Sequence, residues 1–174
     1  YVAGVGGMGT GVVSTLLSRA GMKDGYNVKF CNKKGLAIRN GGVFAHLSFT
    51  REDIVLSPLV PFGKAQLLLG LDALEASRAL DPASKLQVGS KEHTSAVINT
   101  AVTESALSLI GRTSFDTAEL DSVIKHSTKE EGHFSADFFE LSEKLLGDRL
   151  YANLMMIGTA FQLGHIPVSL ESLE

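Results

Sequence analysis

The opening residues constrain the fold of this chain more than any other stretch. A short apolar run meets five glycines between positions 4 and 11, and a helical pattern follows them. The apolar positions of that pattern are Val12, Val13, Leu16, Leu17 and Ala20. The sequence therefore predicts a strand, a glycine turn and a helix, because glycine lets the backbone turn tightly between the two elements.

Gly4, Gly6 and Gly9 match the G-x-G-x-x-G pattern in the strand-to-helix context that it requires. The N–H groups of the first helical turn and the positive end of the helix dipole favour a bound anion. A second interpretation is that the glycines only allow close packing of the strand, the helix and a neighbouring subunit. A dinucleotide has less support, because residues 32–34 lack the acidic ribose-binding residue and Asp24 precedes the second strand.

Two further strands follow the first helix. One is predicted over residues 26–31, and alternating side chains predict another over residues 43–49. Residues 32–42 between them form a basic loop that contains glycine. This loop is short for a parallel crossover, which usually needs a dozen or more residues and a helix. We therefore expect an antiparallel strand in an otherwise parallel sheet.

The remaining elements alternate between strands and helices, as in an α/β protein. Strands are expected at residues 54–57, 67–71, 86–88 and 96–99. Helices are expected from Asp72 or Ala73 to Leu80, at 119–125, at 136–146 with Ser135 as N-cap, at 150–163, and from 167 onward. We predict one domain over residues 1–174, with three α/β/α layers and a Rossmann-like mixed sheet.

Composition narrows the functional classes. A net charge of −3 and a pI near 6.0 give no support for nucleic acid or an acidic membrane surface as a partner. The single cysteine, Cys31, excludes an internal disulfide and a cysteine-ligated iron–sulfur cluster built from this chain alone. No apolar run reaches membrane-spanning length and no signal peptide is visible, so a cytoplasmic location is expected. The histidines lack metal-ligand spacing, and no metal site is predicted.

Several stretches carry a family resemblance when they are taken together and in order. They are G-V-G-G-M-G at residues 4–9, G-L-A-I-R-N-G-G-V-F-A-H at 35–46, L-L-G-L-D-A-L-E-A-S-R-A-L at 68–80, and A-N-L-M-M-I-G at 152–158 with L-G-H-I-P at 163–167. This combination resembles the gamma subunit or domain of the 2-oxoacid:ferredoxin oxidoreductases, which act on pyruvate, 2-ketoisovalerate, 2-oxoglutarate or indolepyruvate. The third and last stretches favour the indolepyruvate branch. Residues 32–42 depart from the family pattern, since they lack an acidic residue and Asn40 separates Arg39 from Gly41, so the 2-oxoacid stays unassigned.

The resemblance implies a subunit that is inactive alone. Its expected partners are alpha, beta and delta-type subunits, which carry thiamine diphosphate and the iron–sulfur clusters. The whole enzyme decarboxylates a 2-oxoacid oxidatively with coenzyme A, giving an acyl-CoA, carbon dioxide and reduced ferredoxin. The gamma part would help to shape the approach of coenzyme A. Two alternatives stay open, namely an autonomous NAD(P)-binding oxidoreductase and a scaffold subunit that binds no ligand.

The predicted cofactor-binding residues come from the glycine turn and the basic loop: Gly6, Gly7, Met8, Gly9, Thr10, Lys33, Arg39 and Asn40. In an open α/β sheet, loops at the carboxyl ends of strands border the ligand crevice. Arg39 could bind a coenzyme A phosphate or the 2-oxoacid carboxylate bidentately, whereas Lys33 would act as a point charge. The alternative for both cations is a solvated loop or an ion pair with a partner subunit. No catalytic residue is assigned.

Other side chains have both a functional and a structural interpretation. His46 could act as a general acid or base, and Cys31 could be a reactive thiol. Asp72 and Glu75 could form a carboxylate pair, although their place at a helix start is typical of caps. The structural interpretation is favoured for each.

Overall fold

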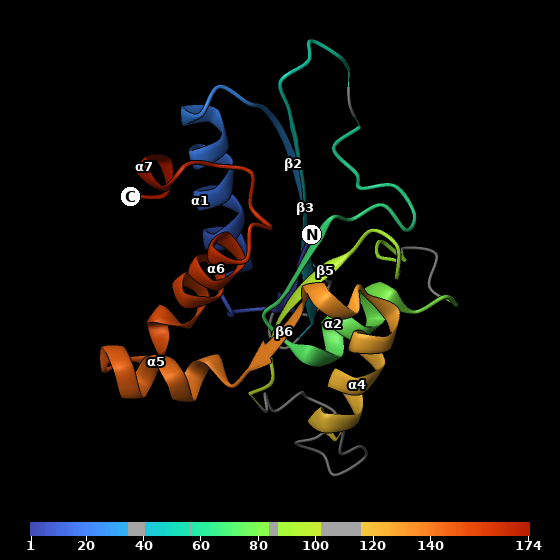
Figure 1. The fold of residues 1–174 in the computed structure, drawn as a ribbon, viewed down its shortest axis with the longest axis vertical. Helices are drawn as coiled ribbons and strands as arrows, with labels where there is room; N and C mark the ends of the chain where they lie inside the picture. Colours follow the sequence, from blue (N-terminus) through green and yellow to red (C-terminus); the bar gives the residue numbers. More distant parts are fainter. Residues whose placement is uncertain (35–40, 56, 84–86, 102–115) are drawn as a thin grey trace.

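The centre of the molecule is a mixed six-stranded sheet (Figure 1). The computed structural model describes residues 1–34, 41–55, 57–83, 87–101 and 116–174. Within these residues the strand order is β2-β3-β1-β4-β5-β6. β1, β4, β5 and β6 run parallel, whereas β3 is antiparallel to both β1 and β2. The predicted mixed sheet with an antiparallel strand is confirmed.

The first part of the chain has the predicted order of elements. β1 (Val2–Val5) leads through the glycine turn into α1 (Thr10–Lys23), and β2 (Asn27–Lys34) and β3 (Gly42–Thr50) follow. β2 extends beyond the predicted residues 26–31, because β3 begins at Gly42 and offers pairing partners to the last residues of β2.

The second part of the sheet is built from parallel strands joined through helices. Its elements are β4 (Leu67–Gly70), α2 (Ala73–Leu80), β5 (Ser95–Asn99), α4 (Thr117–Ser127), the short 3₁₀ helix η1 (Glu130–Gly132) and β6 (His133–Ala136). The predicted β4, α2, β5 and α4 are confirmed within a few residues of their expected bounds.

The C-terminal part is helical. It contains α5 (Phe138–Leu146), the 3₁₀ helix η2 (Arg149–Tyr151), α6 (Ala152–Gln162) and α7 (Leu170–Leu173). α6 lies beside α1, whereas α5 projects away from the sheet (Figure 1). Asp24, just after α1, accepts a hydrogen bond from the Ser169 hydroxyl at 2.7 Å and thereby holds α7. None of the helices in the described ranges is long and apolar enough to cross a membrane.

The start of α5 differs from the prediction. Ser135 and Ala136 belong to β6, which pairs in parallel with β5, and Asp137 is the N-cap of α5 through its bond from the Glu140 N–H at 2.8 Å. The Ser135 hydroxyl donates instead to Asp121 on α4 at 3.0 Å. Pairing with a buried strand therefore overrides the local capping signal at Ser135.

Two short predicted strands are wrong. The described residues at 54, 55 and 57 have no strand conformation, and Val55 is fully exposed. Gln87 and Val88 also form no strand. The Val88 N–H donates to Ala79 O at 2.9 Å and its carbonyl accepts from the Ala65 N–H at 2.8 Å. These two bonds fix Val88 in the core outside the sheet.

Alternate strand residues point into two cores, and this produces the predicted three layers. Val2, Leu69 and Val97 pack with residues of α1 and α6 on one face, among them Val13, Leu17, Met156 and Ile157. Ala3, Leu68 and Ile98 pack with α2 and α4 on the other face, against residues that include Ala76, Leu80 and Ile124. Figure 1 shows the two groups of helices on opposite sides of the sheet.

Asn99 joins three elements at the carboxyl edge of the sheet. It is 1% exposed at the end of β5, and its Oδ1 accepts from the Phe138 N–H at 3.0 Å and the Ala101 N–H at 3.2 Å. Its Nδ2 donates to the Leu71 carbonyl at 3.4 Å. One side chain thus fixes the end of β4, the end of β5 and the start of α5.

Replacing Asn99 with Ala should lower the free energy of unfolding by about 2–4 kcal/mol, because two buried N–H groups and a carbonyl lose their partner. Urea unfolding followed by circular dichroism measures this change. Asn27→Ala at the exposed start of β2 is the control, and its effect should stay within about 0.5 kcal/mol. Equal effects of the two substitutions would contradict a role of Asn99 in joining these elements.

Candidate functional site

The glycine turn lies where the sheet changes the direction of its connections. β1 and β4 are parallel neighbours, and α1 and α2, which follow them, cover opposite faces of the sheet. In doubly wound α/β domains, ligands bind at the carboxyl ends of such a strand pair. The carboxyl end of β1 therefore has the position of a binding site.

Two residues of the turn have positive φ angles, +96° at Gly7 and +83° at Gly9. The Met8 N–H donates to Val5 O at 3.1 Å and closes the turn. Gly9 is the N-cap of α1, and no side chain caps the helix there. Because the first N–H groups of a helix have no acceptor within it, the start of α1 can donate to a ligand.

Thr10 adds an unusual hydroxyl to the base of the turn. The residue is 4% exposed, and its Oγ1 has no hydrogen-bond partner among the described residues. This oxygen lies 3.1 Å from the position that a Cβ on Gly4 would take. A buried polar atom without a partner is costly, so a hydroxyl retained here is a candidate ligand contact.

Asn153 of α6 closes one side of the turn. Its Nδ2 donates to the Met8 carbonyl at 2.7 Å, and a Cβ on Gly9 would lie 2.7 Å from the same nitrogen. Sequence reasoning missed this contact, since Asn153 occurred only within the C-terminal family stretch. No local signal pairs it with Met8, which lies 145 positions earlier.

The turn stays accessible despite Asn153. Gly7 is exposed, and nothing lies within 4 Å of the position of a Cβ built on it. Gly6, Met8 and Gly9 are half-buried, and only Thr10 is buried. In the part of the chain that the structure describes, side chains do not seal the turn, so an anion or a neighbouring polypeptide has a route to it.

Two of the basic residues predicted to lie in a loop beside the site lie in a strand instead. Lys33 and Lys34 are the last residues of β2, paired with Phe44 and Val43, and the prediction of a loop at these positions is wrong. Arg39 and Asn40 lie outside the described residues. The Gly6 N–H donates to Gly41 O at 3.0 Å. The glycine turn therefore contacts the segment that follows Asn40, at the same edge of the sheet as the end of β2.

Two carboxylates stand at the start of α2. Asp72 is the N-cap, since its Oδ1 accepts from the Glu75 N–H at 2.9 Å, which confirms the capping interpretation. Glu75 forms an ion pair with Arg78 and lies so close to Gly42 that a Cβ there would collide with its carboxylate. Burial raises the pKa of Glu75 above its ordinary value of 4.5; Arg78 opposes this shift and Asp72 adds to it.

The remaining candidate residues have structural surroundings. His46 is buried, its Nδ1 accepts from the Val60 N–H at 3.0 Å, and its ring packs edge-on against Tyr1. Cys31 is a half-buried free thiol in β2. Among the described residues, no three His, Cys, Asp or Glu side chains gather as a metal site would require.

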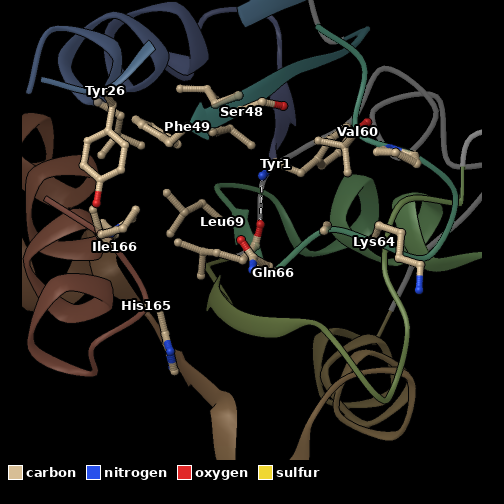
Figure 2. Close-up of a pocket in the computed structure, with 17 residues that line it drawn as sticks. Tyr1, Tyr26, Ser48, Phe49, Val60, Lys64, Gln66, Leu69, His165 and Ile166 are labelled. Carbon is tan, nitrogen blue, oxygen red and sulfur yellow. Dashed lines mark hydrogen bonds between the residues drawn. The ribbon is translucent and has the colours of Figure 1, made fainter. Parts of the chain in front are cut away.

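A separate pocket of about 290 Å³ lies at the opposite edge of the sheet, where β1 and β4 begin (Figure 2). Apolar side chains such as Phe49, Leu69 and Ile166 contribute to its walls, with Gln66 and His165 among the polar groups. Burial lowers the pKa of His165, and the charge of Lys129 adds to this shift. None of the described predicted site residues lines this pocket.

The topology defines a doubly wound α/β domain whose glycine turn lies at the switch point between β1 and β4. Residues 1–174 match the family model described as pyruvate ferredoxin/flavodoxin oxidoreductase. The chain belongs to this family, and the resemblance to it in the sequence is confirmed.

Relatives and solved structures agree with this assignment. The chain is 33% identical to the indolepyruvate oxidoreductase subunit IorB of Methanothermobacter thermautotrophicus over 99% of its own length and 82% of the relative. It is 29% identical to IorB of Archaeoglobus fulgidus, over 99% of this chain and 80% of the relative. Its fold is similar to pyruvate oxidoreductase subunit PORC from Thermotoga maritima, with a TM-score of 0.61 and 16% identity over 99% of this chain and 78% of that chain. Its fold is also similar to the keto/oxoacid ferredoxin oxidoreductase gamma subunit from Geobacter sulfurreducens. The TM-score is 0.58 and the identity is 13%, over 99% of this chain and 79% of that chain.

Substituting Gly9 should destabilise the chain more than substituting Gly7. Both Gly→Ala changes place Ala at positive φ, which costs roughly 1–2 kcal/mol. Only the Gly9 change also displaces the Asn153 amide, which adds about 1 kcal/mol for the lost hydrogen bond. Urea unfolding measures both variants. In an Asn153→Ala background the two substitutions should cost the same, and a persisting difference would contradict the role given to the Asn153 contact.

Glu75 should make the folded state less stable as pH rises. Its pKa is raised on folding, so the folded chain holds this proton above pH 4.5 while the unfolded chain releases it. Relative to Glu75→Gln, the wild type should therefore lose stability as the pH rises above 4.5. Glu140 is the control with the opposite sign, because the hydrogen bond and charge of Lys144 lower its pKa. The stabilising contribution of Glu140 should be present at neutral pH and disappear on acidification. Parallel pH profiles for the two Gln variants would rule out the Glu75 assignment.

Proposed function

We propose that this chain is the gamma-type subunit, formed by a single domain, of a cytoplasmic thiamine-diphosphate-dependent 2-oxoacid:ferredoxin oxidoreductase, and that its glycine turn binds an anionic group of coenzyme A or of the 2-oxoacid. An aryl 2-oxoacid of the indolepyruvate type is the proposed substrate, because curated relatives are named indolepyruvate oxidoreductase subunits. The observation that carries the proposal is the accessible start of α1 with the unpartnered Thr10 hydroxyl at its base.

The electrostatics of the turn suit an oxyanion. N–H groups at a helix start and the dipole of α1 favour negative charge, and the Thr10 hydroxyl can donate one further hydrogen bond. Lys33, Arg39 and Asn40 stay proposed contributors from the neighbouring segment. Thiamine diphosphate and the iron–sulfur clusters are assigned to partner subunits, since a single cysteine cannot hold a cluster.

The strand order argues against the competing NAD(P)-binding function. A classical dinucleotide site takes its ribose-binding acid from the end of the parallel strand next to the first. Here the neighbour of β1 on that side is the antiparallel β3, which begins at Gly42. β2 is one strand further away, and its last residues are Lys33 and Lys34. The sequence of residues 32–42, which join these two strand ends, therefore supplies no ribose-binding carboxylate of its own.

An exposed apolar surface beside the turn supports assembly with a partner. We define the α5–α6 arm by five side chains that are 45–82% exposed: Leu145, Leu146, Leu150, Tyr151 and Leu154. Ion pairs of Glu140 with Lys144 and of Glu143 with Arg149 balance the charges around it. An apolar partner surface without strong net charge therefore matches the arm.

The occupant proposed for the arm is the thiamine-diphosphate-binding subunit. The five side chains leave roughly 300–500 Å² of apolar surface open, about half of what each side of a stable interface buries. The arm alone is thus too small for a symmetric dimer. The arm and the glycine turn both involve α6, since Leu154 belongs to the arm and Asn153 contacts Met8. A partner seated on both the arm and the turn would cover the bound anion as well.

Thr10→Val in the assembled oxidoreductase tests the proposed site. It should raise the apparent KM for coenzyme A or for the 2-oxoacid about tenfold, since a hydrogen bond to a charged group is lost. Thermal stability should not fall, because the hydroxyl has no partner to lose within the described structure. Thr15→Val on the exposed face of α1 is the matched control and should change neither KM.

Three outcomes would reject the proposal. Unchanged KM values in Thr10→Val would exclude the anion site and favour the scaffold alternative. NADH binding by the wild-type chain, followed by fluorescence, would favour the autonomous oxidoreductase. Failure of a thiamine-diphosphate-binding subunit to co-purify with the tagged chain from its own host would exclude the assembly itself.

A further inference from the structure

We infer that Asn153 is a ligand-contacting residue of the oxyanion site, and that it also fixes the glycine turn in its binding conformation. This inference rests on the proposed function, since it concerns the same anion. Asn153 comes from a helix far from the turn in sequence, and neither the sequence pattern nor the names of the relatives assign it a role.

The hydrogen bond to Met8 determines how the Asn153 amide is oriented. The Met8 carbonyl can only accept, so the side-chain atom 2.7 Å from it is the Nδ2 donor. Nδ2 carries two N–H groups, and Met8 O uses one of them. The same nitrogen stands 2.7 Å from the position of a Cβ on Gly9, directly over the N-cap of α1. Among the described residues Nδ2 has no second acceptor, so its other N–H can donate to an anion near the helix start.

The backbone of Asn153 is held rigidly, which makes its position reproducible. Ala152 before it is 1% exposed and Met156 is 0% exposed, and both belong to the core beneath α6. Asn153 itself is half-buried and lies on the side of α6 that meets the turn. Because only its side chain reaches the opening, changes there leave the packing of α6 largely intact.

Because the Asn153 side chain is a neutral amide that donates hydrogen bonds, substitutions at this position should weaken anion binding to different degrees. Ala removes the donor to the anion and the bond to Met8. Asp places a carboxylate against the Met8 carbonyl and next to the bound anion, so it adds repulsion to the lost donor. Gln keeps the amide on a longer side chain and can restore part of the interaction. The order of binding strength should be Asn, then Gln, then Ala, then Asp.

The test uses the oxidoreductase purified through a tag on this chain, with Asn153→Ala, Asn153→Asp and Asn153→Gln. We expect one apparent KM to rise about tenfold in the Ala variant and further in the Asp variant, while kcat stays within about twofold. Coenzyme A and the 2-oxoacid are titrated separately, and the KM that moves identifies the source of the oxyanion. Asn27→Asp, which adds the same charge at the exposed start of β2, should change neither KM.

Three results would overturn the inference. If both KM values and kcat change together in proportion to a fall in Tm, Asn153 is only structural. If neither KM moves while Thr10→Val raises one, the anion site exists without Asn153, and the proposed function survives. If Thr10→Val and all Asn153 variants leave both KM values unchanged, the proposed anion site fails together with the inference.

Discussion

The left-handed backbone of Gly9 is the constraint on which the geometry of this site depends. At φ +83° it turns the chain from β1 into α1 within a few residues and leaves the start of the helix uncapped by any side chain. A second feature favours glycine at this position, because the Asn153 amide would have to move to make room for a Cβ. Gly9 thus combines a left-handed backbone, a close contact with Asn153 and an uncapped helix start.

Local sequence signals were sufficient for the part of the fold next to this position. The glycines and the periodicity of residues 12–20 predicted β1, the turn and α1, and alternation predicted β3. The short connection between β2 and β3 predicted the antiparallel strand. These signals succeed because each depends on residues close together in the chain, where turn geometry and side-chain period act directly.

Longer-range contacts account for what the sequence did not reveal. The local sequence predicted Ser135 as a helix cap. In the structure it belongs to β6, because residues 133–136 pair with β5. The local sequence predicted Lys33 as a loop residue. In the structure it belongs to β2, because β3 extends far enough to pair with it. For the candidate site, the sequence pattern predicted Gly6 to Thr10, whereas Asn153 and the unpartnered state of the Thr10 hydroxyl emerge only from packing. The antiparallel strand β3 beside β1 likewise makes the strand order at the glycine turn differ from that of a classical dinucleotide site.

The Met8–Asn153 hydrogen bond joins residues 145 positions apart, and this separation determines how late in synthesis the contact can form. A ribosome makes the glycine segment well before α6. A nascent chain that contains the complete β1–α1 unit still lacks the amide that holds its turn. The Asn153 contact that holds the turn can therefore form only after α6 has been translated.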